Sequence, residues 1–101
     1  MGRILSMTQV LVLEPSLGLK EAMPLKTALI ERRGQPLEID ASHVQRLGGL
    51  CLQVLLSARR MWADDHQPLT IKASSDAFGE AIRLFGAQAH FDPFDPRGEV
   101  R

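Results

Sequence analysis

The sequence predicts one small α/β domain with a mostly parallel sheet of about four strands, covered by three to four helices. Short apolar or alternating stretches, typical of strands, lie near residues 10–13, 37–42 and 69–73. Apolar residues at helical spacing follow each stretch. This alternation of strands and helices favours parallel strands joined by helical crossovers. With 101 residues, the chain suffices for one hydrophobic core.

The first strand and helix are predicted from the N-terminal third of the chain. The apolar run at residues 10–13 stops before Pro15, and its length suits a buried strand. In the helix that follows, we place Pro24 in the first turn, because a proline further inside costs about 3 kcal/mol. The helix then starts near residues 20–23 and ends before a left-handed cap at Gly34. Its apolar positions recur at helical spacing: Ala22, Leu25, Ala28 and Leu29.

The second helix has the most regular apolar pattern in the chain. From Leu50 onward, the residues expected to face the core are Leu50, Cys51, Val54, Leu55, Ala58, Met61 and Trp62. A third helix begins after the capping side chains at residues 74–76 and ends near Phe85, before Gly86. We expect one domain over residues 1–91, with an edge strand at 89–94 that Pro93 limits. Residues 92–101 have the composition of a flexible tail.

Charge and cysteine content restrict the partners and the compartment. Twelve Lys and Arg balance twelve Asp and Glu, so no positive field attracts nucleic acid or anionic lipid. The pairs Arg32-Arg33, Arg59-Arg60 and Asp64-Asp65 are interpreted as solvated helix surfaces. A single cysteine, Cys51, excludes an internal disulfide and indicates a reducing compartment. No apolar stretch has the length to span a bilayer, so we expect a soluble, cytoplasmic protein.

No combination of residues in the sequence predicts catalysis. His43, His66 and His90 lie far apart, and none has a second metal ligand at helical spacing. Cys51 lies on the apolar stripe of its helix, where a thiol is usually an unreactive core residue. Gly48-Gly49 is not part of a longer phosphate-binding motif. We therefore expect no enzyme, no metal and no cofactor.

The turn at residues 44–49 and the helix after it are the most distinctive surface features. Two readings of Gly48-Gly49 are open: a steric need for a tight connection, or backbone amides left accessible to a partner. Leu52 and Leu56 lie four residues apart, off the main apolar stripe. They are interpreted either as a contact surface or as side chains buried under neighbouring loops.

Residues 37–56 resemble the signature of STAS domains, the family of the bacterial anti-sigma factor antagonists. In that family a strand ending in Asp-x-Ser leads to Asp-Ser-x-Gly and a leucine-rich helix. Asp40 and Ser42 match the first motif. In the second, Gly48 falls on the family's Asp, Gly49 on its phosphorylatable Ser, and Cys51 on its Gly. The resemblance extends over about residues 10–91 and implies the STAS fold.

The chain looks most similar to the small STAS proteins found with bacterial chemotaxis genes. The residues that carry this narrower resemblance are Asp40-Ala-Ser42, Val44, Arg46, Gly48, Cys51, Gln53-Val-Leu55, Trp62, Asp65 and Ser75-Asp-Ala-Phe78. It implies binding to a chemotaxis histidine kinase or its response-regulator circuit. Alternatives are a STAS subunit of a lipid-transport ATPase, a degenerate anti-sigma factor antagonist, and a small-molecule-binding or thiol enzyme using Cys51.

The resemblance and the turn together predict a binding surface without a phosphorylation switch. Glycine has no hydroxyl, so Gly49 is a degenerate phosphoacceptor position. Ser42 and Ser57 are nearby hydroxyls, and Ser42 is of the type that caps a turn. The expected partner-binding residues are Arg46, Gly48, Gly49, Leu52, Gln53, Leu56 and Arg60.

Overall fold

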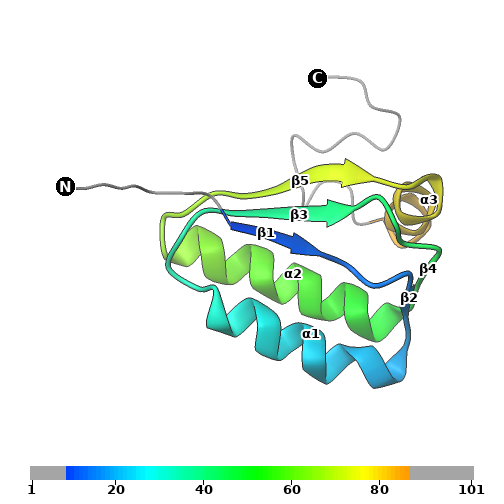
Figure 1. The fold of residues 1–101 in the computed structure, drawn as a ribbon, viewed down its shortest axis with the longest axis horizontal. Helices are drawn as coiled ribbons and strands as arrows, with labels where there is room; N and C mark the ends of the chain where they lie inside the picture. The colour runs from blue at the N-terminus through cyan, green and yellow to red at the C-terminus, as the bar shows by residue number, and fades with distance from the viewer. Residues whose placement is uncertain (1–8, 87–101) are drawn as a thin grey trace.

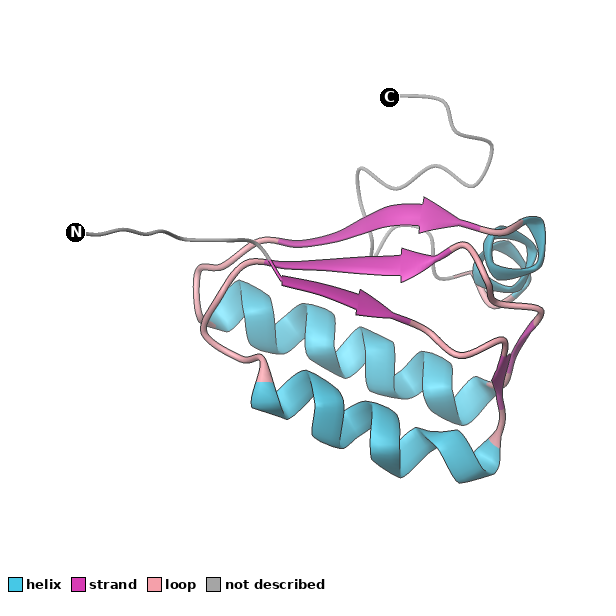
Figure 2. Ribbon diagram, in the orientation of Figure 1, coloured by secondary structure: helices cyan, strands magenta, loops and turns pink. Residues whose placement is uncertain are grey.

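The computed structural model describes residues 9–86, which form three helices and five strands (Figure 1). The strands and helices are, in chain order, β1 (Gln9–Val12), β2 (Ser16–Leu17), α1 (Leu19–Glu31), β3 (Leu37–Ala41), β4 (Arg46–Leu47), α2 (Gly49–Asp64), β5 (Leu69–Ser74) and α3 (Asp76–Leu84). Figure 2 shows α1 and α2 side by side beneath the sheet, with α3 beyond the carboxyl ends of its strands. The predicted α/β fold class is confirmed.

The main sheet is parallel and has the order β1-β3-β5, so β3 is its central strand. Gln9 pairs with Leu37, which in turn pairs with Leu69. The side chains of β3 alternate between buried and half-buried, and the buried ones belong to the core cluster that also contains residues of α1 and α2. A register shift between Ile39 and Asp40 marks an irregularity just before the carboxyl end of β3.

A second, two-stranded sheet was not expected from the sequence. Ser16 and Leu17 of β2 pair in parallel with Arg46 and Leu47 of β4. Two-residue strands are too short to produce a hydrophobic period, so only the folded chain reveals this pairing. Its effect is to bring the start of α1 next to the start of α2.

The hydrophobic core lies between the main sheet and the helices. Trp62, Phe78, Ile39, Leu55 and Ile82 are among its fully buried side chains. The indole Nε1 of Trp62 also donates a hydrogen bond to the carbonyl oxygen of Gln35 at 2.7 Å. This bond satisfies the polar atom that burial of a tryptophan brings into the core.

Several local predictions are confirmed. Gly34 and Gly86 follow α1 and α3 with φ of +91° and +67°, the left-handed conformation expected after a helix. The Ser75 hydroxyl accepts a hydrogen bond from the Phe78 amide at 3.0 Å, as expected of a helix N-cap. The expected edge strand at 89–94 and the tail at 92–101 lie outside the described residues.

The predicted placement of Pro24 in the first turn of the first helix is wrong. α1 begins at Leu19, so Pro24 is its sixth residue and lies in the second turn. Gly18 is the N-cap, and the Glu21 carboxylate accepts a hydrogen bond from its amide at 2.8 Å. This amide-to-carboxylate bond caps a helix that starts one residue before the predicted range of 20–23. The proline removes one helical hydrogen bond, which the rest of the fold compensates.

The apolar stripe of α2 is also rotated from the expected one. Leu50 is 50% exposed, whereas Leu52 is only 3% exposed and belongs to the core. Both residues adjoin Cys51, and at 100° per residue they lie on opposite flanks of the buried line through Cys51 and Leu55. The helical spacing of apolar residues does not predict which of these two flanks the rest of the fold buries.

An ion pair between two residues predicted to lie on the surface has a structural role. The Arg33 guanidinium donates to both Asp65 carboxylate oxygens, at 2.8 and 3.3 Å. Asp65 is the C-cap of α2, so this pair ties the segment after α1 to the end of α2. The solvated helix end expected at residues 64–65 is therefore confirmed, with Asp64 exposed and the Asp65 side chain partly exposed within its ion pair.

Candidate functional site

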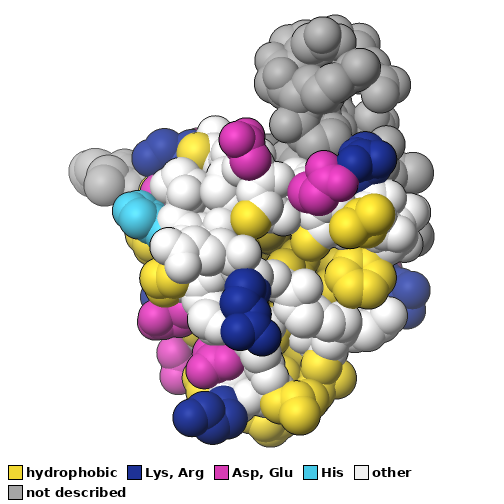
Figure 3. All heavy atoms as spheres, turned by 90° about the vertical axis from the view of Figure 1, so that its right-hand side faces the viewer, with side chains coloured by type: hydrophobic (Ala, Val, Ile, Leu, Met, Phe, Trp, Pro, Cys, Tyr) yellow, Lys and Arg dark blue, Asp and Glu magenta, His cyan; other side chains and the backbone are white. Residues whose placement is uncertain are grey.

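The predicted site lies at the carboxyl end of the main sheet, the end that faces the viewer in Figure 3. Three segments meet there: the end of β3, the β2–β4 pair and the first turn of α2. In open parallel sheets, this end is where ligands and partners usually bind. Figure 3 shows both charged and hydrophobic side chains on this surface.

Asp40 and Ser42 form a hydrogen-bonded unit just after β3. The Ser42 amide and hydroxyl both donate to Asp40 Oδ1, at 2.9 and 2.6 Å. These bonds, the hydroxyl one first, lower the pKa of the Asp40 carboxyl below its ordinary value. The arrangement is an Asx-type turn that shapes the path of the chain into β4. The serine hydroxyl already has an acceptor, so its observed role is structural.

Gly48 lies in close contact with the backbone of the β2–α1 turn. Its amide donates to the carbonyl oxygen of Leu17 at 2.9 Å. A Cβ at this position would lie 3.1 Å from the same oxygen, and 3.9 Å from Gly18 Cα. This distance is shorter than an ordinary contact, and the neighbour is backbone that β2–β4 pairing holds in place. The steric interpretation of the double glycine is therefore correct at Gly48.

Gly49 is in a different environment. It is exposed, and a Cβ built on it meets no atom within 4 Å. Packing among the described residues gives no reason for glycine here. A serine at this position, as in the related switch proteins, would present its hydroxyl to solvent without a clash.

The remaining predicted contact residues are only partly brought together. Arg46, Gln53 and Arg60 are exposed, as a contact surface requires, and Leu56 is half-buried against the core. Leu52 is buried and is no surface residue, so its assignment as a direct contact was wrong. Leu52 instead packs into the core and anchors the N-terminal part of α2 there.

Cys51 has the properties of a core residue. It is fully buried, and its thiol donates a hydrogen bond to the carbonyl oxygen of Gly18 at 3.3 Å. Burial, and to a lesser extent the Glu21 carboxylate, raises the pKa of the thiol. A raised pKa lowers the fraction of reactive thiolate, in agreement with the core interpretation.

Residues 9–86 contain no group of three or more His, Cys, Asp or Glu placed to hold a metal ion. His90 lies outside this range. Within the same range, no helix combines the length and hydrophobicity needed to cross a membrane.

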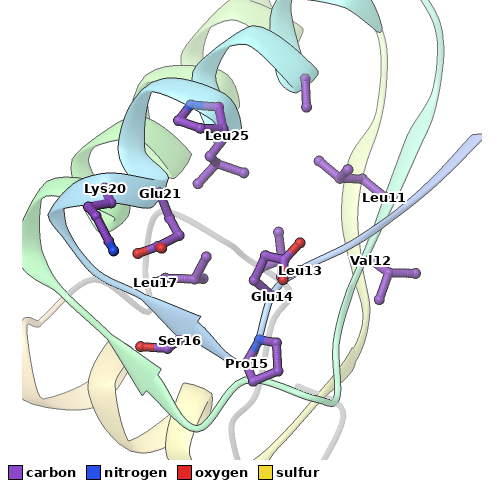
Figure 4. A pocket seen from close by; sticks show the side chains of 12 residues that line it. Leu11, Val12, Leu13, Glu14, Pro15, Ser16, Leu17, Lys20, Glu21 and Leu25 are labelled. Atoms are coloured by element: carbon purple, nitrogen blue, oxygen red, sulfur yellow. The ribbon is translucent and has the colours of Figure 1, made fainter.

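A cavity that sequence reasoning missed opens between β1 and α1 (Figure 4). Its volume is about 560 Å³, and its walls are mostly aliphatic side chains such as Leu11, Leu13 and Leu25. Lys20 and Glu21 lie on the α1 side. The Glu21 carboxylate is engaged by the Gly18 amide. No sequence signal marks this cavity, because it arises from the packing of an edge strand on a helix.

A comparison with protein families agrees with this geometry. A family model described as "Mlab, STAS domain" matches residues 3–91. The chain belongs to the STAS domain family. STAS domains are generally non-enzymatic protein-interaction modules of the anti-sigma factor antagonist-like class. A search of curated proteins found no match.

Proposed function

We propose that this STAS domain is a constitutive docking module in bacterial signalling, which binds a chemotaxis-type histidine kinase or its response-regulator circuit in the cytoplasm. The observation that carries the proposal is Gly49. The resemblance places the phosphorylatable serine of the family there, yet the chain has no hydroxyl at this exposed position. Binding through this turn therefore does not depend on added phosphate charge.

The docking surface consists of Arg46, Gly48, Gly49, Gln53, Leu56 and Arg60. Arg46 and Arg60 are exposed, and neither forms an ion pair with another described residue. Unpaired arginines on the rim of an interface accelerate association with an acidic partner. Leu56 supplies a half-buried apolar contact, and Gly49 presents neither a hydroxyl nor a charge to the partner.

The test combines charge reversal with a matched control. The variant Arg46→Glu with Arg60→Glu is compared with Lys72→Glu combined with Arg83→Glu, which changes the net charge equally on other exposed surfaces. Binding to the purified histidine kinase of the same genome is measured by calorimetry. We expect the first variant to weaken the Kd at least about tenfold and the second to change it little. Equal Kd values for the two would refute the docking surface.

A second candidate starts from the matched family model, described as "Mlab, STAS domain". It is the alternative that the resemblance also implies, a STAS subunit bound to the ATPase of a lipid transporter. The same calorimetric series, repeated with that ATPase, separates the two candidates. Binding to the ATPase alone would replace the kinase proposal, and a degenerate anti-sigma factor antagonist would bind an anti-sigma factor instead.

A further inference from the structure

The outward side of α1 carries a row of exposed apolar residues that the core does not use. Leu19, Met23 and Ile30 are 79%, 65% and 49% exposed, and they follow the spacing i, i+4 and i+11. The missing i+7 position is Lys26, which is also exposed. Residues at this spacing lie on one side of a helix. The row is therefore continuous over about three turns and has one cation inside it.

α2 presents a matching row next to it. Leu50, Val54, Ser57 and Met61 repeat the same spacing, with Leu50 half exposed and Val54 and Met61 half-buried. The two helices run in the same direction side by side (Figure 1), and β2–β4 pairing sets their starts next to each other. The two rows therefore begin at the same end of the helix pair.

A groove lies between the two rows. Its volume is about 330 Å³, and its lining comprises Leu29, Ile30 and Lys26 from α1 and Val54, Met61 and Ser57 from α2, with Gln53 beside them. Apolar side chains form most of the walls. Lys26 forms no ion pair with another described residue. The Arg33–Asp65 pair ties the segments that follow the ends of both helices together.

We propose that this groove binds an amphipathic helix of a partner protein, one that has an acidic residue in the middle of its apolar stripe. Two parallel helices with aligned apolar rows accept a third helix in the groove between them, as in other helix-in-groove complexes. Apolar residues of the partner cover the rows, and its carboxylate pairs with the Lys26 ammonium. Charged pairing at a single position of an apolar seam also fixes the register.

The charge in the groove favours a different protein over a second copy of this chain. A two-fold axis through the middle of the groove would bring the Lys26 ammonium groups of both copies towards each other. Like charges facing each other across an apolar contact oppose association. The groove residues Lys26 and Ile30 do not belong to the docking surface around Arg46 and Gly49, and Gln53 is the one groove-lining residue that the two surfaces share.

The test uses a designed peptide of about 16 residues, long enough for about four helical turns. It carries leucine at i, i+4 and i+11 and a single glutamate at i+7, on an otherwise alanine and glutamine helix with a fluorescent label. Fluorescence anisotropy measures its Kd for the full chain and for Lys26→Glu, Ile30→Asp and the control Leu84→Asp. Leu84 is 72% exposed on α3, outside the groove. Circular dichroism verifies that each variant is folded.

We expect saturable binding by the parent chain and by Leu84→Asp, and a loss of at least about tenfold with Lys26→Glu or Ile30→Asp. A peptide with lysine in place of its glutamate should restore binding to Lys26→Glu. The proposal is overturned if the parent chain does not bind, or if the groove variants bind as well as the parent. It is also overturned if sedimentation shows a dimer of the free chain that Ile30→Asp dissociates. Arg46→Glu should leave peptide binding unchanged, which separates this proposal from the docking surface.

Discussion

The amide of Gly48 donates to the carbonyl oxygen of Leu17, and that oxygen lies 3.1 Å from where a Cβ on Gly48 would be. This contact joins the β4–α2 turn to the β2–α1 turn. It also separates the two glycines by role, because Gly49 has open space around it. Gly48 maintains the close contact between the two turns, whereas Gly49 is exposed and has room for a side chain.

The two glycines should therefore respond in opposite ways to alanine. Gly48→Ala should lower the free energy of unfolding by about 1 kcal/mol, because the new methyl group forces the Leu17 carbonyl to move. Gly49→Ala should raise it by about 0.5 kcal/mol, since Gly49 is the first helical residue and alanine restricts the unfolded chain. Urea denaturation of the two variants measures both values. The same sign for both changes would contradict the assignment.

Leu50 and Leu52 provide a test of how α2 is oriented. Leu52→Ala should lower the free energy of unfolding by about 2–4 kcal/mol, because it leaves a cavity at a residue only 3% exposed. Leu50→Ala should change it by no more than about 0.5 kcal/mol, since Leu50 is half exposed. Thermal and urea unfolding give the comparison. A larger loss for Leu50→Ala would mean that the helix is rotated towards the stripe expected from its periodicity.

The Asp40–Ser42 unit should make a small part of the stability depend on pH. The pKa of Asp40 is lowered in the folded chain, so its contribution is complete above the unfolded value of about 4. It disappears as the pH falls through the lower folded pKa. Ser42→Ala should raise the pKa of Asp40 in NMR titrations, and should destabilise the chain more at neutral pH than under acid conditions. A pKa of Asp40 that Ser42→Ala leaves unchanged would exclude the hydroxyl hydrogen bond as a cause of the lowered pKa.

Cys51 should react with a thiol reagent only when the chain opens. It is fully buried and its pKa is raised, so both access and thiolate fraction oppose reaction. Labelling in native buffer should be slow and should accelerate sharply in denaturant. Rapid stoichiometric labelling of the folded chain would favour the thiol-enzyme alternative.

Local signals in the sequence were sufficient for much of the fold. Gly34, Gly86 and Ser75 mark helix ends through their own backbone preferences, and the structure places them as expected. Pro24 led to a wrong prediction for the first turn of α1. The helix is capped by a hydrogen bond between the Gly18 amide and the Glu21 carboxylate, and the sequence prediction gave more weight to the proline than to this cap. The β2–β4 pair joins residues far apart in the chain, and no local pattern predicts it.

The candidate site was predictable to a similar degree. The resemblance located Asp40, Ser42 and the glycine turn, but sequence alone gave Gly48 and Gly49 equal roles. Only the position of the Leu17 carbonyl distinguishes them. Leu52 could not be assigned to core or surface, because it lies on the edge of a helical stripe and neighbouring elements decide its burial. The aligned rows on α1 and α2 depend on how the helices are set beside each other.

The most direct test of the central claim introduces negative charge at the position where related proteins carry a phosphorylated serine. Gly49→Asp should fold, because the position has open space, and it imitates the added charge. Calorimetry should show that the unmodified chain binds the histidine kinase and that Gly49→Asp weakens the Kd at least about tenfold, whereas Gly49→Ala has little effect. Binding that is absent in the unmodified chain, or equal in Gly49→Asp, would contradict a constitutive docking surface at this turn.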